Sequence, residues 1–175
     1  IYTLSLHDAL PILSRYQRNT GEMGDGSLGP SLIVCPASLV YNWGAEFTKF
    51  APSFNAVVVA GTKAERRTAI GRAFRADEPT VLITSYDLLR RDVDDYTANE
   101  QRFNVMALDE AQYIKNHTTK IAKAVKAVAA DHRFALTGTP IENRLSELWS
   151  IFDFLMPGLL GSYKRFHERY ELPIS

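Results

Sequence analysis

Two adjacent carboxylates, Asp109 and Glu110, follow the apolar run Val105 to Leu108 in the stretch NVMALDEAQ. A short apolar run that ends in charge is typical of a strand buried on both faces of a parallel sheet. The carboxylates would then emerge at the carboxyl end of that strand, where open α/β sheets bind their ligands. Such a pair suits metal–phosphate chemistry, with Asp109 holding Mg²⁺, directly or through its water, and Glu110 orienting or activating an attacking water. A structural alternative is that Asp109 caps the next helix and Glu110 lies in its first turn.

Short apolar segments alternate with helical patterns from Ser31 onward, which indicates parallel βαβ units with right-handed crossovers. We expect strands at residues 31–35, 56–59, 80–84, 105–108 and 134–137. We expect helices at residues 38–50, 63–76, 86–92, 118–130, 143–155 and 163–170. The sequence therefore predicts an α/β fold in which helices flank a parallel sheet.

Composition sets bounds on what the chain can bind. Its 175 residues are enough for one domain with a proper core, and the formal net charge is +0. Any nucleic-acid contact must therefore come from local patches rather than from overall attraction. Cys35 is the single cysteine, which excludes an intrachain disulfide. No apolar run approaches the roughly 20 residues that span a bilayer, so we expect no membrane contact.

The first thirty residues differ in character from the rest. Residues 1–12, IYTLSLHDALPI, look like translated sequencing-adapter read-through, and we expect them to be non-native. Residues 13–20 suit the tail of a helix, and residues 21–30 a glycine-rich loop. Three glycines of that loop have G-x-G-x-x-G spacing, but a dinucleotide fingerprint needs a strand before it and a helix after it. Here a strand follows, which favours a plain loop.

Four segments with polar or turn-forming residues fall at the ends of predicted strands. They are LIVCPASLVYNW (32–43), ITSYDLLRR (83–91), DEAQ (109–112) and ALTGTPIEN (135–143). Parallel strands end at one edge of a sheet, and hydroxyls and backbone N–H groups there suit phosphate oxygens. Each segment also has a structural explanation, since Ser38 is a good helix N-cap and Thr-Gly-Thr-Pro is a good turn.

Together these segments resemble a known family. The chain from Ser31 onward is similar to the first ATPase lobe of the Swi/Snf-related (sucrose-non-fermenting-type) helicase-like ATPases of superfamily two, and to their bacterial branch in particular. CPASLVYNWGAEFTKF resembles motif Ia, TSYDLLRRD motif Ib and DEAQYIKN motif II. ALTGTPIENRLSELWSIFDFLMPGLLGSYKRF resembles motif III with the extension that follows it in this family.

The resemblance implies a RecA-like P-loop NTPase fold, with ATP and Mg²⁺ as cofactors and translocation along double-stranded DNA, generally without strand separation. Asp109 would serve Mg²⁺, Glu110 the hydrolytic water, and Gln112 would link nucleotide state to the other motifs. The residues implied to couple the nucleotide to DNA are Thr137, Gly138 and Thr139. The residues that belong to the motifs lining the DNA path are Pro36, Ser38, Trp43, Ser85 and Tyr86. Trp43 also suits a core position, because its helix is amphipathic.

The chain departs from the family in what it lacks. A P-loop of the form G-x-x-x-x-G-K-[ST] should precede Leu13, yet the sequence contains no Gly-Lys pair. The second lobe, with its arginine fingers, is also missing. We therefore expect residues 31–175 to be an incomplete first lobe that lacks its P-loop unit and does not hydrolyse ATP by itself. The parent protein would be an ATP hydrolase of the bacterial cytoplasm, associated with the nucleoid.

Two other functions remain open from the sequence. One is a lobe of a strand-separating helicase of the same superfamily, against which the ELWSIFDFL extension argues. The other is a non-catalytic DNA- or protein-binding module derived from such a lobe. The missing P-loop favours the module, and the intact Asp109–Glu110 pair argues against it.

Overall fold

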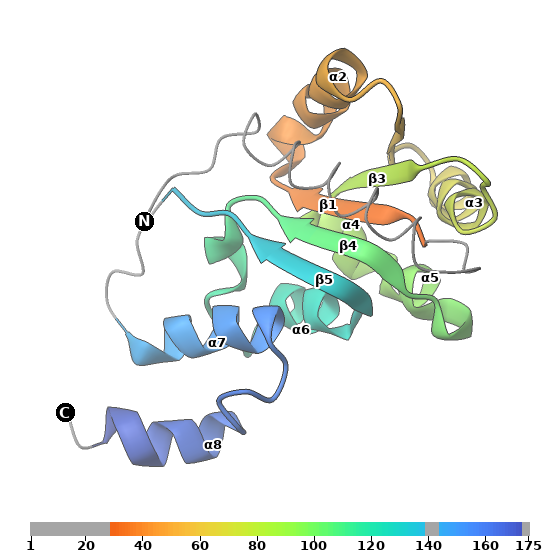
Figure 1. The fold of residues 1–175 in the computed structure, drawn as a ribbon. Helices are drawn as coiled ribbons and strands as arrows, with labels where there is room; N and C mark the ends of the chain where they lie inside the picture. The colour runs from red at the N-terminus through yellow and green to blue at the C-terminus, as the bar shows by residue number, and fades with distance from the viewer. Residues whose placement is uncertain (1–28, 139–143, 173–175) are drawn as a thin grey trace, which may run out of the picture.

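A single parallel sheet organises the chain. A computed structural model describes residues 29–138 and 144–172, and in it five strands pair in the order β2-β3-β1-β4-β5, all parallel (Figure 1). The strands are β1 Ser31–Cys35, β2 Asn55–Val58, β3 Thr80–Ser85, β4 Phe103–Leu108 and β5 Ala130–Ala135. The predicted α/β fold with a parallel sheet is confirmed. The expectations for residues 1–28 lie outside the described residues.

Helices connect successive strands and follow the last one. They are η1 Ala37–Leu39, α2 Val40–Phe50, α3 Lys63–Ala73, α4 Tyr86–Arg91, α5 Val93–Thr97, η2 Ala98–Glu100, η3 Ala111–Ile114, α6 Lys120–Ala127, α7 Leu145–Leu155, α8 Tyr163–Phe166 and η4 His167–Glu171. Their starts follow local capping chemistry, since the hydroxyls of Thr62, Ser85 and Thr119 accept hydrogen bonds from the first turns of α3, α4 and α6. In α3 the cap is a full capping box with Glu65.

Alternating strand residues build two cores, one on each face of the sheet. Leu32 and Val34 of β1 face a core completed by α3, α4, α5, α6 and α7. Ile33 and Cys35 face the other core, which α2 completes with Trp43 and Phe47 among the described residues. Figure 1 shows α2 on one side of the sheet and α6 and α7 on the other. The side chains of β1 are fully buried, as a strand covered on both faces requires.

The largest error in the predicted elements concerns the end of α6. A helix was expected over residues 118–130, but α6 ends at Ala127, Val128 is extended, and β5 begins at Ala130. β5 overlaps the expected strand 134–137 only at its end, because Asp131, His132 and Arg133 interrupt the apolar pattern of its first half. Those residues are tolerated because β5 is an edge strand of the described sheet and most of it is only half-buried.

The structure shows why position 29, in the predicted loop, is a glycine. A Cβ added there would lie 2.3 Å from the carbonyl oxygen of Arg102, closer than real Cβ contacts. The approach is fixed by the next residues, because the N–H of Asn104 donates to the carbonyl of Pro30 at 3.0 Å. Gly29 therefore serves backbone packing. Gly24 and Gly26 lie outside the described residues.

We expect Gly29→Ala to lower the free energy of unfolding by about 1–3 kcal/mol, the usual cost of overpacking. The measurement is the urea midpoint followed by circular dichroism. Gly71→Ala is the matched control, because in α3 the nearest atoms to its new Cβ belong to the flexible Arg75 side chain at 3.4 Å. An alanine in a helix is expected to raise the midpoint slightly. Equal midpoints for Gly29→Ala and the wild type would contradict the packing role.

Candidate functional site

The acid pair lies at the carboxyl edge of the sheet, between the ends of three strands. All six residues of β4 are buried, and Asp109 and Glu110 directly after them are half-buried. The N–H of Asp109 donates to the carbonyl of Val34 at the end of β1, at 2.8 Å. The N–H of Ala111 donates to the carbonyl of Leu136 just after β5, also at 2.8 Å. Backbone bonds therefore fix the acidic turn to both neighbouring strands.

Each carboxylate oxygen of Asp109 accepts one hydrogen bond. Oδ1 accepts from the backbone N–H of Glu110 at 2.9 Å, and Oδ2 accepts from the indole Nε1–H of Trp43 at 2.9 Å. The alternative in which Asp109 caps the next helix is wrong. The element that follows is the short 3₁₀-helix η3, whose N-cap is Glu110, and no side chain of the described residues caps it.

Tyr86, the first residue of α4 directly after β3, supports the same turn. Its hydroxyl donates to the backbone carbonyl of Asp109 at 2.6 Å, and its ring stacks on Tyr113 with centroids 4.7 Å apart and planes within 2° of parallel. The side chain is 2% exposed. Burial and the nearby Asp109 raise the pKa of Tyr86 well above its usual value, so the phenol stays protonated and remains a donor.

A line of side-chain hydrogen bonds joins the acid pair to the end of β5. The amide of Gln112 donates to Oε2 of Glu110 at 2.6 Å, and the hydroxyl of Thr137 donates to Oε1 of Gln112 at 3.0 Å. Asp109, Glu110, Gln112 and Thr137 therefore lie together, as their predicted positions at parallel strand ends require. Gly138 follows directly and is exposed, whereas Thr139 lies outside the described residues.

Cys35 lies beneath this edge and takes no part in nucleophilic chemistry. Its thiol donates to the carbonyl of Thr84 at 3.8 Å, and the residue has no exposed surface. Burial, with a smaller effect of Asp109, raises the pKa of Cys35 to about 12. Because the thiolate is the reactive form, a thiol held protonated in this way is inert.

The five residues expected near a DNA path differ in how far they are exposed to solvent. Ser38 is exposed and Pro36 is half-buried, at the start of η1. Ser38 does not cap α2, whose N-cap is Leu39. The hydroxyl of Ser85 accepts from the N–H of Leu88 at 3.3 Å and caps α4. Trp43 and Tyr86 point into the protein toward Asp109. The assignment of these five residues to a DNA path stays a prediction.

The acid pair offers few protein ligands, which suits Mg²⁺ better than a metal ion that takes three or more ligands from the protein. A carboxylate has about four lone-pair sites and, among the described residues, the two hydrogen bonds donated to Asp109 leave the other sites available to a cation. Magnesium is commonly held by one or two carboxylates together with phosphate oxygens and water. Within residues 29–138 and 144–172, no group of three or more His, Cys, Asp or Glu side chains is placed to hold a metal. The donors present therefore match a magnesium ion carried by a phosphate ligand.

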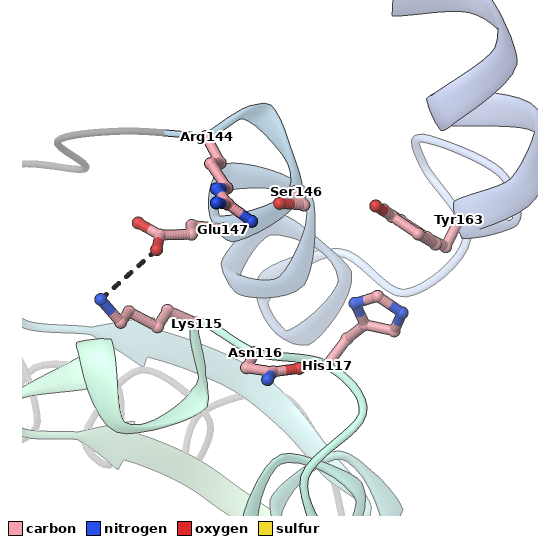
Figure 2. A pocket seen from close by; sticks show the side chains of 7 residues that line it. All are labelled: Lys115, Asn116, His117, Arg144, Ser146, Glu147 and Tyr163. Carbon is pink, nitrogen blue, oxygen red and sulfur yellow. Dashed lines mark ion pairs between the residues drawn. The ribbon is translucent and has the colours of Figure 1, made fainter. Parts of the chain in front are cut away.

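A pocket separate from the acid pair's own residues lies beyond η3. It is a pocket of about 310 Å³ between the loop after η3, the start of α7 and the start of α8 (Figure 2). Its lining residues are Lys115, Asn116, His117, Arg144, Ser146, Glu147 and Tyr163. Figure 2 shows Lys115 reaching Glu147 across the mouth, with Nζ and Oε1 3.3 Å apart. None of these residues was predicted as functional, and only the position of 115–117 directly after the acidic segment could have drawn attention to them.

The floor of this pocket is aromatic. The ring of His117 lies 4.1 Å from that of Tyr163 and 5.2 Å from that of Trp149. Burial, with a smaller effect of Lys126, lowers the pKa of His117 below its usual value. The histidine is therefore neutral near pH 7 and acts as a packing ring there.

In the part of the chain that the structure describes, no helix is long and apolar enough to cross a membrane.

Comparison with known proteins places this geometry in a family. The family model described as SNF2-related domain matches residues 3–175. TATA-binding protein-associated factor MOT1 of Saccharomyces cerevisiae is 48% identical over 146 residues, which are 83% of this chain and 8% of that protein. An uncharacterized ATP-dependent helicase of Mycoplasma pneumoniae is 47% identical over 142 residues, which are 81% of this chain and 13% of that protein. The chain thus spans about a tenth of the length of these relatives, which include eukaryotic as well as bacterial proteins.

A solved structure gives the same result for the fold. The SWI2/SNF2 ATPase core of Sulfolobus solfataricus, in complex with double-stranded DNA, superposes with a TM-score of 0.74 at 39% identity. The match covers 93% of this chain and 32% of that core. The prediction of a RecA-like sheet with flanking helices is confirmed. With a family model that matches nearly all of its residues, this chain belongs to the SNF2-related domain family.

Proposed function

We propose that this chain is the part of a double-stranded-DNA translocase that holds the magnesium ion of ATP and positions the hydrolytic water. The observation that carries the proposal is the hydrogen-bonded line from Asp109 through Glu110 and Gln112 to Thr137. It joins the acid pair to the hydroxyl of Thr137, just after the neighbouring strand β5, at the carboxyl edge of a parallel sheet, where such sheets bind ligands. Membership of the SNF2-related family supports nucleotide use at this edge.

Each residue of the line has a proposed role. Asp109 holds Mg²⁺, which when bound neutralises charge on the phosphate oxygens. Glu110 accepts a hydrogen bond from the attacking water and draws off its proton. Gln112 and Thr137 link the position of Glu110 to the end of β5 through their hydrogen bonds. Thr137, Gly138 and Thr139 are proposed to couple the nucleotide to DNA.

Double-stranded DNA is the proposed macromolecular partner. The related core of Sulfolobus solfataricus was solved in complex with double-stranded DNA. In this chain the start of η1, with half-buried Pro36 and exposed Ser38, offers backbone and hydroxyl groups at a strand end, and Ser85 supports the neighbouring strand end as the buried cap of α4. Such groups contact phosphates and carry no sequence information. We therefore propose binding without sequence preference and movement along the duplex without strand separation.

The remaining catalytic parts would come from elsewhere in a longer protein. A P-loop and a second lobe would supply the phosphate cradle and the arginine fingers. We propose a bacterial parent that works on the nucleoid in the cytoplasm; a Mycoplasma pneumoniae relative is 47% identical and a Saccharomyces cerevisiae relative 48% identical, so the identities do not decide between bacteria and eukaryotes. A non-catalytic DNA- or protein-binding module is the second candidate.

A chimera tests the proposal. The matching segment of the Sulfolobus solfataricus ATPase core is replaced by residues 31–172 of this chain. We expect ATP hydrolysis that double-stranded DNA stimulates, measured by phosphate release with linear duplex. Asp109→Asn in the chimera is the matched control and should abolish that stimulation.

The same chimera separates the two candidates. Cooperative melting and duplex binding without hydrolysis above the Asp109→Asn level would favour the non-catalytic module. Displacement of a labelled strand from a forked duplex would instead indicate a strand-separating helicase.

A further inference from the structure

Trp43 links the helix α2 to the acid that would hold magnesium. The residue has no exposed surface, and its indole N–H donates to Oδ2 of Asp109 at 2.9 Å. The contact joins positions 66 residues apart in the sequence. It exists because β1, which leads into α2, pairs directly with β4, which leads into the acid pair. The indole ring also packs on the ring of Phe47, with centroids 6.2 Å apart, which restricts its movement.

The direction of the Asp109 carboxylate depends on two donors. The backbone N–H of Glu110 fixes Oδ1, and the indole of Trp43 fixes Oδ2. The first bond alone restrains Oδ1 and leaves the position of Oδ2 less well fixed. With both, the remaining lone pairs of the two oxygens point in a set direction. Donors of this kind, which orient a metal-binding carboxylate from behind, commonly change metal affinity or activity 10–100-fold when removed.

We propose that Trp43 is a positioning residue for the metal site, and that its indole N–H holds the Asp109 carboxylate in the orientation that binds the cation. This inference rests on the proposed function, because it takes Asp109 as the metal ligand. It assigns Trp43 a role different from contact with DNA. The role needs the N–H and not only the volume of the ring.

The two tryptophans of the chain give a built-in comparison. Trp149 also donates its indole N–H, but to the carbonyl of Gly161 at 3.3 Å, on α7 and away from the acid pair. In a ¹⁵N-labelled chain each indole N–H gives one signal. We titrate Mn²⁺, which takes oxygen ligands like Mg²⁺ and broadens nearby signals. We expect the Trp43 signal to broaden first, the Trp149 signal to persist, and excess Mg²⁺ to restore Trp43.

Removal of the donor gives the quantitative test. Trp43→Phe keeps an aromatic ring in the core and loses the N–H, and we expect it to weaken Mn²⁺ binding about 10–100-fold, measured by the relaxation of water protons. Trp149→Phe is the control and should leave the affinity unchanged. If Trp43→Phe does not fold, 3-benzothienylalanine at position 43 keeps the shape of the indole and replaces the N–H by sulfur.

The outcomes separate this inference from the proposed function. Selective broadening that Asp109→Asn abolishes, together with weaker binding in the position-43 variants, supports the inference. Binding that depends on Asp109 but is equally tight without the indole N–H overturns it and leaves the metal site in place. If Asp109→Asn does not alter Mn²⁺ binding, Asp109 is not the ligand, and both the inference and the proposed metal site are wrong.

Discussion

Glu110→Gln in the chimera is expected to lower DNA-stimulated ATP hydrolysis by about 10²–10⁴-fold, the usual contribution of a general base. The amide has the same shape as the carboxylate, and its oxygen can still accept from Gln112, as Oε2 of Glu110 does at 2.6 Å. The loss would therefore come from the missing proton acceptor and not from a disturbed turn. Phosphate release at saturating ATP and duplex measures the effect.

An acid outside the proposed line of residues gives the control. Glu147 pairs with Lys115 across the pocket beyond η3, away from Asp109. Glu147→Gln in the same chimera should leave hydrolysis essentially unchanged. Binding of a fluorescent ATP analogue should be similar in both variants, because Glu110 acts on water. Full hydrolysis by the Glu110→Gln chimera would show that another group activates the water.

The largest expected effect on stability concerns the buried ion pair between Arg66 and Asp92. Two bonds join them, Nε to Oδ2 at 2.5 Å and Nη2 to Oδ1 at 2.8 Å, and the side chain of Asp92 is 1% exposed. The guanidinium also donates to the carbonyl of Gly61 at 2.7 Å. Asp92→Ala leaves the Arg66 charge buried without its partner, so we expect a loss of about 3–5 kcal/mol in the free energy of unfolding.

The neighbouring pair provides a matched comparison. Arg67 of α3 lies 3.3 Å from Asp95 of α5, but the Arg67 side chain is 76% exposed. Exposed pairs contribute about 0–1 kcal/mol, so Arg67→Ala should barely shift the urea midpoint. Similar midpoints for Asp92→Ala and Arg67→Ala would mean that water reaches the Arg66–Asp92 pair and that its burial contributes little.

The sheet around the acid pair could be predicted because its central strands are continuous apolar runs. β1 and β4 are buried on both faces, so their sequences carry an unbroken hydrophobic signal that ends where the chemistry begins. β5 gave a signal only at its end, where a strand over residues 134–137 is expected, and its first half gave none. In that first half Arg133 is accommodated because its guanidinium donates to the carbonyls of Phe154 and Val128 and lies over the Phe154 ring. A partner 21 residues away cannot be read from local pattern.

The candidate site shows the same division. The position of Asp109, Glu110, Gln112 and Thr137 at one edge could be predicted because parallel strands end together, which is a property of the fold class. The roles of Gln112 and Thr137 came from the family resemblance and stay predictions. The role of Trp43 was not found, because the sequence offered only a core position or a DNA contact for it. Its bond to Asp109 depends on which strands are neighbours, and that order is set by the packing of the whole sheet.

Glu110 occupies a left-handed backbone conformation, with φ 52° and ψ 55°. A side chain in that region costs about 1–2 kcal/mol, which glycine avoids. Selection of this domain for heat resistance alone would therefore favour glycine at position 110 and discard the proposed base. The carboxylate would persist only in lineages where turnover, rather than durability, decides survival.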